Sequence, residues 1–95
     1  MNFLNRDKDL KHFLKDVLYD AILFVDGVSK VKDIKGKLLK DKREVICDIY
    51  LCVDYNVVIS DVAWKVQNVC KDILKSVEDI NVKSINIHII GVIER

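Results

Sequence analysis

The sequence predicts an α+β fold, a two-layer sandwich in which two helices cover one face of a small mixed sheet. Two segments, residues 9–25 and 59–77, repeat apolar residues at the spacing of a helix. Two others, residues 45–55 and 84–89, alternate apolar and polar residues with period two, as half-buried strands do. With one further strand after the first helix, the order is α-β-β-α-β. Elements that each have one apolar face bury one another most simply in two layers.

Length and composition fit one domain, residues 1–95. Half of the residues are apolar, so one modest core can form without disulfides or metal. The formal net charge of +1 argues against a surface built as a whole to hold nucleic acid or an anionic membrane. The three cysteines are an odd number without a C-x-x-C pair, which indicates reduced thiols acting as small hydrophobic side chains.

The expected location of the protein is the cytoplasm. Charges interrupt the apolar residues at the N-terminus, which is unlike a signal peptide. No apolar run approaches the roughly 20 residues that a membrane-spanning helix needs. Any contact with a membrane is therefore expected to be peripheral or to pass through a partner.

The first helix is expected over residues 9–25. Its apolar stripe consists of Leu10, Phe13, Leu14, Val17, Leu18, Ala21, Phe24 and Val25. It should end at Asp26-Gly27, because glycine can take the left-handed backbone that closes a helix. The extended segment that follows mixes β-branched residues with lysines, so we expect a strand near residues 29–34 and then a turn at Gly36.

The strand at residues 45–55 has the clearest alternation. The face expected to be buried consists of Val45, Cys47, Ile49, Leu51, Val53 and Tyr55. The opposite face consists of Ile46, Asp48, Tyr50, Cys52 and Asp54. In the final strand, Ile85, Ile87 and Ile89 lie on one face, and Ser84, Asn86 and His88 lie on the other. A right-handed crossover through the second helix would return this strand parallel to the long one.

The second helix has the broader stripe: Ile59, Val62, Ala63, Val66, Val69, Cys70, Ile73, Leu74 and Val77. Ser60 is the expected N-cap, because its hydroxyl can accept a hydrogen bond from a free backbone N–H. Ile59 and Trp64 would then form a hydrophobic staple. Helical geometry also places Trp64 opposite the centre of the stripe, so the alternative is an anchor for a protein partner or a second copy. The neighbours that would share such a contact are Gln67, Asn68 and Lys71.

Four motifs between about residues 21 and 92 carry a family resemblance. They are "DGV" at residues 26–28, "ICDIYLCVDYN" at 46–56, "ISDVAWKVQNVCKDI" at 59–73 and "INIHIIGV" at 85–92. Their order and spacing resemble the alkaline-shock-protein family, also called the envelope stress response family. In that family the long strand usually ends in an aromatic residue followed by glycine. Here the pair is Tyr55-Asn56, and asparagine is the residue that best replaces glycine in a left-handed backbone.

The resemblance implies a small, non-enzymatic cytoplasmic protein that works through protein contacts. Some members of the family are linked to envelope stress or reach the membrane through a partner, and others are linked to lipid metabolism. The family's motifs look structural, so the resemblance implies no catalytic residue, cofactor or metal. A protein partner or a homo-oligomer is the expected assembly.

Charge is distributed unevenly along the chain, because residues 29–43 form a basic segment. Its basic residues are Lys30, Lys32, Lys35, Lys37, Lys40, Lys42 and Arg43. Only two acidic residues accompany these seven, so the segment has an excess of five positive charges and the rest of the chain carries −4. The segment could contact phosphates of RNA or of anionic lipid. The alternative is a solvated strand edge, whose lysines discourage aggregation between sheets.

The order of elements is also similar to the bacterial KH RNA-binding fold. That fold binds nucleotides with a G-x-x-G loop. The three glycines of this chain never form this motif, and a fold alone does not transfer a function. Nucleic acid is therefore the lesser alternative.

The outer face of the sheet offers another candidate surface. If their strands are neighbours, Tyr50 and His88 could form a binding patch or a surface for self-association. Cys52 with His88 is the one conceivable pair of nucleophile and base, and we interpret it as incidental. The histidines and aspartates show no metal-ligand spacing.

Overall fold

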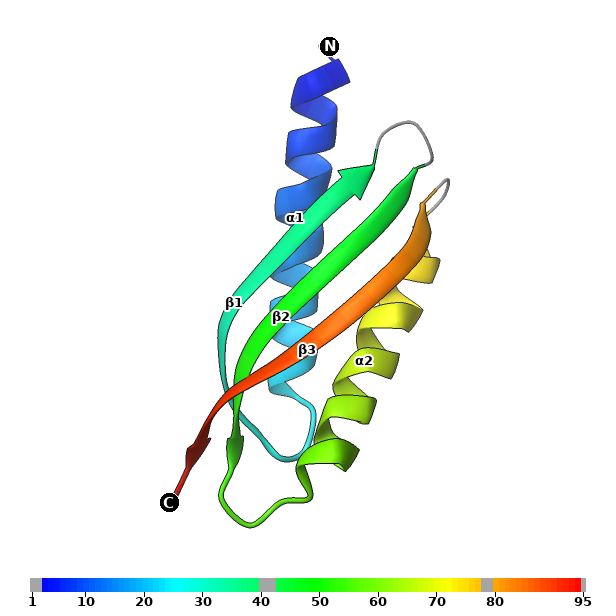
Figure 1. Ribbon diagram of the computed structural model, residues 1–95. Helices are drawn as coiled ribbons and strands as arrows, with labels where there is room; N and C mark the ends of the chain where they lie inside the picture. The colour runs from blue at the N-terminus through cyan, green and yellow to red at the C-terminus, as the bar shows by residue number, and fades with distance from the viewer. Residues whose placement is uncertain (1–2, 40–42, 78–79, 95) are drawn as a thin grey trace.

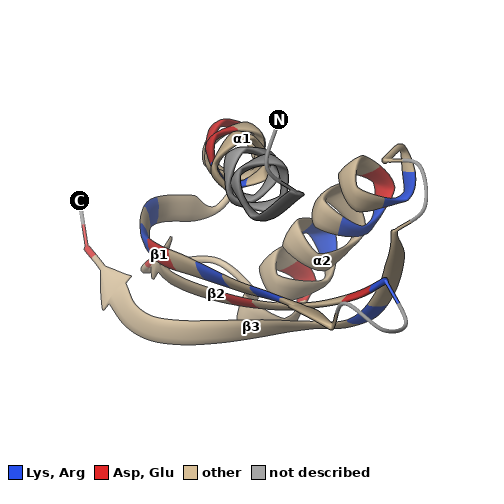
Figure 2. Ribbon diagram, turned by 90° about the horizontal axis from the view of Figure 1, so that it is seen from above, with Lys and Arg blue, Asp and Glu red and all other residues tan. Residues whose placement is uncertain are grey.

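The computed structural model describes residues 3–39, 43–77 and 80–94. Its elements are α1 (Phe3–Leu23), β1 (Val28–Leu39), β2 (Glu44–Asp54), α2 (Ile59–Lys75) and β3 (Asn81–Ile93). The order confirms the predicted α-β-β-α-β arrangement (Figure 1). Seen from above, both helices lie on the same side of the sheet (Figure 2), as the two-layer prediction requires.

The sheet places β2 in the centre, in the order β1-β2-β3. The pairing of β1 with β2 is antiparallel, and that of β2 with β3 is parallel, so the sheet is mixed. Across the three strands, Tyr50 lies opposite Asp33 of β1 and opposite His88 of β3. The last strand is therefore the direct neighbour of the long one, which the sequence left open.

The core lies between the sheet and the helices. From α2 it takes Val62, Val66, Cys70 and Leu74. From β2 it takes Val45, Cys47, Ile49, Leu51 and Val53. These two sets follow the predicted helical and alternating patterns, because each element has one side against the other layer. The two elements with the strongest periodicity thus supply most of the core.

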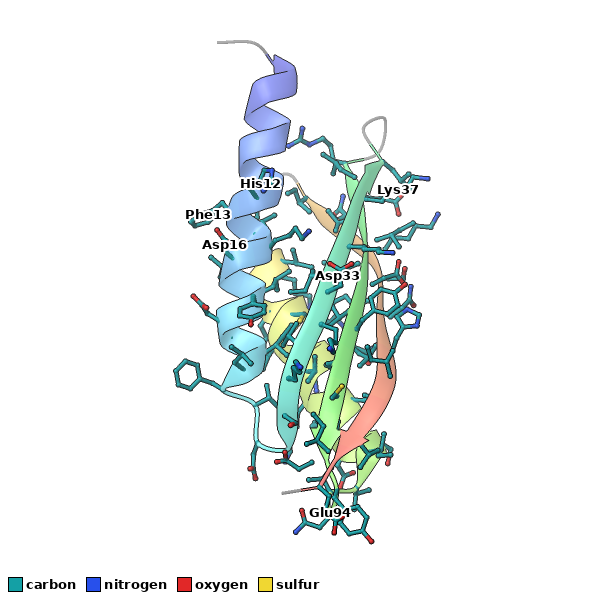
Figure 3. The ribbon with its side chains drawn as sticks, turned by 90° about the vertical axis from the view of Figure 1, so that its left-hand side faces the viewer. His12, Phe13, Asp16, Asp33, Lys37 and Glu94 are labelled. Carbon is teal, nitrogen blue, oxygen red and sulfur yellow. The ribbon has the colours of Figure 1, made fainter. Side chains whose placement is uncertain are left out.

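The stripe of α1 differs from the prediction at two aromatic residues and at Ile22, which the predicted stripe left out. Among the side chains of this helix that the structure describes, those from residue 12 on, the buried ones are Leu14, Leu18 and Ile22, and the predicted Leu10 lies outside this range. Phe13 is 63% exposed and lies on the side of α1 that faces away from the sheet (Figure 3). Phe24 is 91% exposed because the helix ends at Leu23, one residue before it. The helix also begins at Phe3, earlier than its apolar pattern indicated.

The first strand is longer than expected. The predicted turn at Gly36 is wrong: Gly36 lies within β1 and pairs with Cys47 of β2. The ladder with β2 supplies partners along the whole segment, which overrides the weak strand preference of a single glycine. At the far end of β2, Tyr55 was expected on the buried face, but it is 67% exposed because the strand ends at Asp54.

The start of α2 also corrects the prediction. Its N-cap is Val58, without a side-chain capping bond, so Ser60 is not the cap. A helix capped at Val58 has its staple positions at Val57 and Val62. Val62 is buried, and Val57 packs against the core. The predicted staple of Ile59 and Trp64 is therefore absent.

Asn56, which follows Tyr55, does not take the left-handed backbone that the family resemblance suggested. Among the described non-glycine residues, only Arg43 has a positive φ, at 54°. Asn56 therefore turns without a left-handed conformation. The chain needs that conformation instead at Gly27, where φ is 95° and where the sequence predicted it.

Gly27 joins three parts of one end of the molecule. Its carbonyl accepts a hydrogen bond from the N–H of Asp54 at 2.9 Å. A Cβ atom at this position would lie 2.6 Å from Cγ2 of Val62 and 3.2 Å from Cγ1 of Val57. The absence of a side chain thus lets the turn between α1 and β1 pack directly against the start of α2.

Replacing Gly27→Ala should lower the free energy of unfolding by on the order of 2–4 kcal/mol, because left-handed strain and overpacking add. The matched variant is Gly91→Ala, whose Cβ would lie 3.1 Å from Sγ of Cys52 at an ordinary φ. It should cost about 1 kcal/mol, since a small shift relieves that contact. Urea unfolding of both variants measures the difference. Equal losses would contradict the role given to Gly27.

Candidate functional site

A polar cluster lies on the outer face of the sheet, opposite the helices. The parallel register of β2 and β3 sets Asp48 opposite Asn86 and Tyr50 opposite His88. Oδ1 of Asp48 accepts a hydrogen bond from Nδ2 of Asn86 at 3.1 Å. The same oxygen lies 2.9 Å from Nε2 of His88. One carboxylate thus holds two side chains of the neighbouring strand.

An aromatic stack extends the cluster across the sheet. The rings of Tyr50 and His88 are parallel within 10°, with their centroids 4.5 Å apart. From β1, Nζ of Lys35 approaches the Tyr50 ring to 5.3 Å, a distance suited to a cation–π interaction. We call these five residues, Lys35, Asp48, Tyr50, Asn86 and His88, the outer-face cluster. It connects all three strands on the side without helices.

The outer-face cluster keeps its carboxylate ionised. The hydrogen bond with His88, followed by that from Asn86, holds the pKa of Asp48 below its usual value of 3.8. The positive charge of Lys35 acts in the same direction, while partial desolvation opposes it. Because Oδ1 accepts from Asn86 and lies 2.9 Å from Nε2 of His88, both on β3, the carboxylate serves as a clamp between β2 and β3.

The thiols of Cys47 and Cys70 are protonated at neutral pH. Burial, and to a lesser extent the charge of Asp48, raises the pKa of Cys47 to about 11. Burial raises the pKa of Cys70 to about 12, with a smaller contribution from Cys47. Only a thiolate attacks as a nucleophile, so both groups are inert. Cys52 is buried beside Gly91, while the Nε2 atom of His88 is directed at Asp48.

Two general features of the described part of the chain bear on function. Among the side chains that the structure describes, those of residues 12–39, 43–77 and 80–94, no group of three or more His, Cys, Asp or Glu residues could hold a metal ion. Within residues 3–39, 43–77 and 80–94, neither helix combines the length and the apolar character that crossing a membrane requires.

The predicted contact residues of α2 lie on a second surface. Trp64 is 65% exposed, with exposed Lys71 and half-buried Asn68 on the same side of the helix. Gln67 connects the helix to the sheet: its Nε2 donates a hydrogen bond to the carbonyl of Ile85 in β3 at 2.9 Å. The two predicted contact surfaces therefore lie on different sides of the molecule: Tyr50 and His88 face the side of the sheet without helices, and Trp64 lies on the helix layer. We call the side chains of Trp64, Asn68 and Lys71 the α2 face.

The basic segment forms most of an exposed edge strand. Lys30, Lys32, Lys35 and Lys37 are exposed along β1, and Figure 3 shows Lys37 on the side of β1 away from α1. Arg43 is half-buried, and its carbonyl accepts a hydrogen bond from the N–H of Asn81 at 2.8 Å. The predicted contacts Lys40 and Lys42 lie outside the described residues.

A family profile decides the relationship that the motifs indicated. The profile of the alkaline-shock-protein family, described as having a cell envelope-related function, matches residues 23–94. The chain belongs to the alkaline-shock-protein family. The resemblance carried by the four motifs is thus confirmed. A comparison with curated protein sequences gave no significant match.

Solved structures confirm the fold of this alkaline-shock-protein family member. A variant of the MamM CTD aligns with a TM-score of 0.70 at 13% identity, covering 92% of this chain and 98% of the MamM chain. A zinc form of such a variant gives 0.67 at 14% identity, over 90% of this chain and 86% of the other. A copper form of another variant gives 0.67 at 12% identity, over 90% and 98%. Identities this low establish a shared fold and nothing further.

Three contacts at these surfaces were not predicted from the sequence. The alternation placed Asp48 and Asn86 on the outer face, but their contact depends on a register that no local pattern specifies. Lys35 was assigned to an anion-binding segment, whereas the structure sets it over Tyr50. Gln67 gave no signal of its bond to β3, because that bond depends on how α2 lies against the sheet.

Replacing Asp48→Asn should change how stability responds to acid. In the native chain the pKa of this carboxyl is lowered, so it binds its proton more weakly than in the unfolded chain. Its stabilisation is therefore complete above the ordinary value of 3.8 and is lost as pH falls through the lower folded value. The variant should be less stable than the native chain at pH 6. This difference in stability, the gap between the two chains, should narrow below pH 3.8.

Thermal unfolding between pH 2.5 and 6 measures this gap. The matched control is Asp16→Asn, which removes an exposed carboxylate on α1, away from the outer-face cluster. A gap between native and Asp48→Asn chains that stays constant over this range would contradict the assigned role of Asp48.

Proposed function

We propose that this member of the alkaline-shock-protein family is a non-catalytic protein-interaction module, an adaptor that works in the cytoplasm and reaches the envelope through a protein partner. The observation that carries the proposal is the exposure of Trp64 on the α2 face. The family description supports the connection to the cell envelope.

The side chain of Trp64 is not part of the hydrophobic staple at the start of α2. The positions of a staple are taken by Val57 and Val62, so the indole can be removed without opening the joint between β2 and α2. Tryptophan is among the residues most enriched at the energetic centres of protein interfaces. Here it has polar neighbours, Asn68 and Lys71, of the kind that form an interface rim.

The chemistry of the outer-face cluster and of the buried thiols supports a non-catalytic role. A general base or nucleophile needs a free reactive group near its ordinary protonation range. Asp48 is engaged by two neighbours, and the thiols of Cys47 and Cys70 stay protonated. The outer-face cluster thus resembles a cross-strand support more than a reaction centre.

Replacing Trp64→Ala should weaken association by about tenfold or more, as loss of an interface anchor does, while changing stability by only about 0.5 kcal/mol. Association with other proteins is measured by crosslinking and mass spectrometry in native cells. The control is Tyr19→Ala, which removes an aromatic residue that is 44% exposed on α1. Lost stability with intact association would contradict the proposal.

A second candidate function is anion binding by β1, favoured by its four exposed lysines. It predicts binding to single-stranded RNA or to anionic vesicles that weakens steeply as salt rises. The test variant combines Lys30→Glu, Lys32→Glu and Lys37→Glu and leaves Lys35 over Tyr50. Loss of binding is the expected result for this candidate, and unchanged affinity would remove it.

A further inference from the structure

The two edges of the sheet differ in charge. The outer edge of β1 carries four exposed lysines, which oppose the approach of another strand of the same kind. In β3, residues 84–93 include no charged side chain. An exposed strand edge without charges is a template for pairing with a further strand.

Two hydrogen bonds show which way the backbone of β3 points. The carbonyl of Ile93 accepts the N–H of Tyr55, the residue after β2, at 2.9 Å, so Ile93 faces the sheet. The carbonyl of Ile85 accepts the side chain of Gln67, so Ile85 faces away from β2. In a strand, successive residues point their N–H and C=O groups to opposite sides.

This alternation identifies the open positions. The ladder is regular from Ser84 to Ile89, so Ile87 and Ile89 face the same side as Ile85. A register shift follows, because Leu51 lies opposite Ile89 and the next residue of β2 lies opposite Gly91. After this shift, Val92 faces the open side, since the next residue faces β2. We call the stretch from Ile87 to Val92 the β3 edge.

The cover that α2 gives to this strand is local. Gln67 reaches the strand at Ile85, but the C-terminal end of β3 runs away from α2 in both Figure 1 and Figure 2. There, Ile90 is 53% exposed and Val92 is 49% exposed. The β3 edge thus combines open backbone groups with exposed β-branched side chains.

We propose that the β3 edge pairs with the same edge of a second copy of this chain, antiparallel, to form one continuous sheet of two chains. This goes beyond the proposed function, because it assigns a contact to a surface other than the α2 face. Strand addition of this kind derives its affinity from main-chain hydrogen bonds. A two-fold axis brings the same patch of both copies together, and that arrangement makes the strands antiparallel.

The charges at the two ends of β3 favour a second copy of this chain as the partner of the β3 edge. Exposed Lys83 precedes the uncharged stretch, and exposed Glu94 follows it. Antiparallel pairing brings Lys83 of each copy toward the second copy's Glu94. Parallel pairing would bring like charges together, and pairing through β1 would bring lysines together. The strand is therefore complementary to itself in one orientation.

Amide hydrogen exchange, followed residue by residue by NMR as the concentration of the full chain rises, tests the geometry. The outward N–H groups of Ile87, Ile89 and Val92 should exchange at least about tenfold more slowly in the associated state. Those of Asn86 and His88 face β2 and should not change. Association without protection of the three outward groups would overturn strand pairing and leave the Trp64 proposal standing. A chain that stays monomeric, or that gains this protection only with another protein, would overturn the second copy as occupant.

A charge exchange tests the partner and the orientation without touching the core. Lys83→Glu alone and Glu94→Lys alone should each weaken self-association by roughly tenfold, because each sets like charges together twice. Mixed in equal amounts, the two variants should form mixed pairs with restored affinity. Sedimentation at low and high salt measures all three samples. Unchanged self-association of the single variants, or no recovery on mixing, would overturn the proposal.

Discussion

The central position of β2 is the constraint on which the rest of the structure depends. It pairs with β1 on one side and β3 on the other, and its alternating apolar residues form the floor of the core. The same alternation sends Asp48 and Tyr50 to the outer face, where they meet their neighbours from β1 and β3. A shift of one residue would exchange the two faces, so burial of the apolar set also sets the register of the polar cluster.

Sequence reasoning succeeded where burial alone determines structure. The stripe of α2 and the alternation of β2 were predicted because each repeats over many residues, and one misplaced residue barely alters the pattern. It failed at ends and turns, and also at Phe13, which lies inside α1 but is exposed. Phe24 continued the helical spacing but falls after the end of α1, and Gly36 suggested a turn within a strand that β2 holds extended. Local signals at such positions are weaker than long-range pairing.

The candidate surfaces show the same division. Alternation was sufficient to place Asp48, Tyr50, Asn86 and His88 on one face, but the distances between them required the pairing of β2 with β3. At the start of α2, a serine gave the stronger capping signal, yet Val58 is the cap because Val62 is then directed at Gly27. That shift of the cap leaves Trp64 outside the joint, and it changes the interpretation of this residue from packing to contact.

The bond from Gln67 to Ile85 explains why the two proposed contact regions lie on neighbouring elements. It fixes α2 against the edge of β3 at one point, and it occupies a carbonyl that would otherwise be open to another strand. Beyond this point β3 runs away from α2, so cover by the helix ends where the open edge begins (Figure 1). A chain with protected edges everywhere would carry charges on β3 as it does on β1. The difference between the two edges is therefore most simply understood as a requirement for pairing on one side and for solubility on the other.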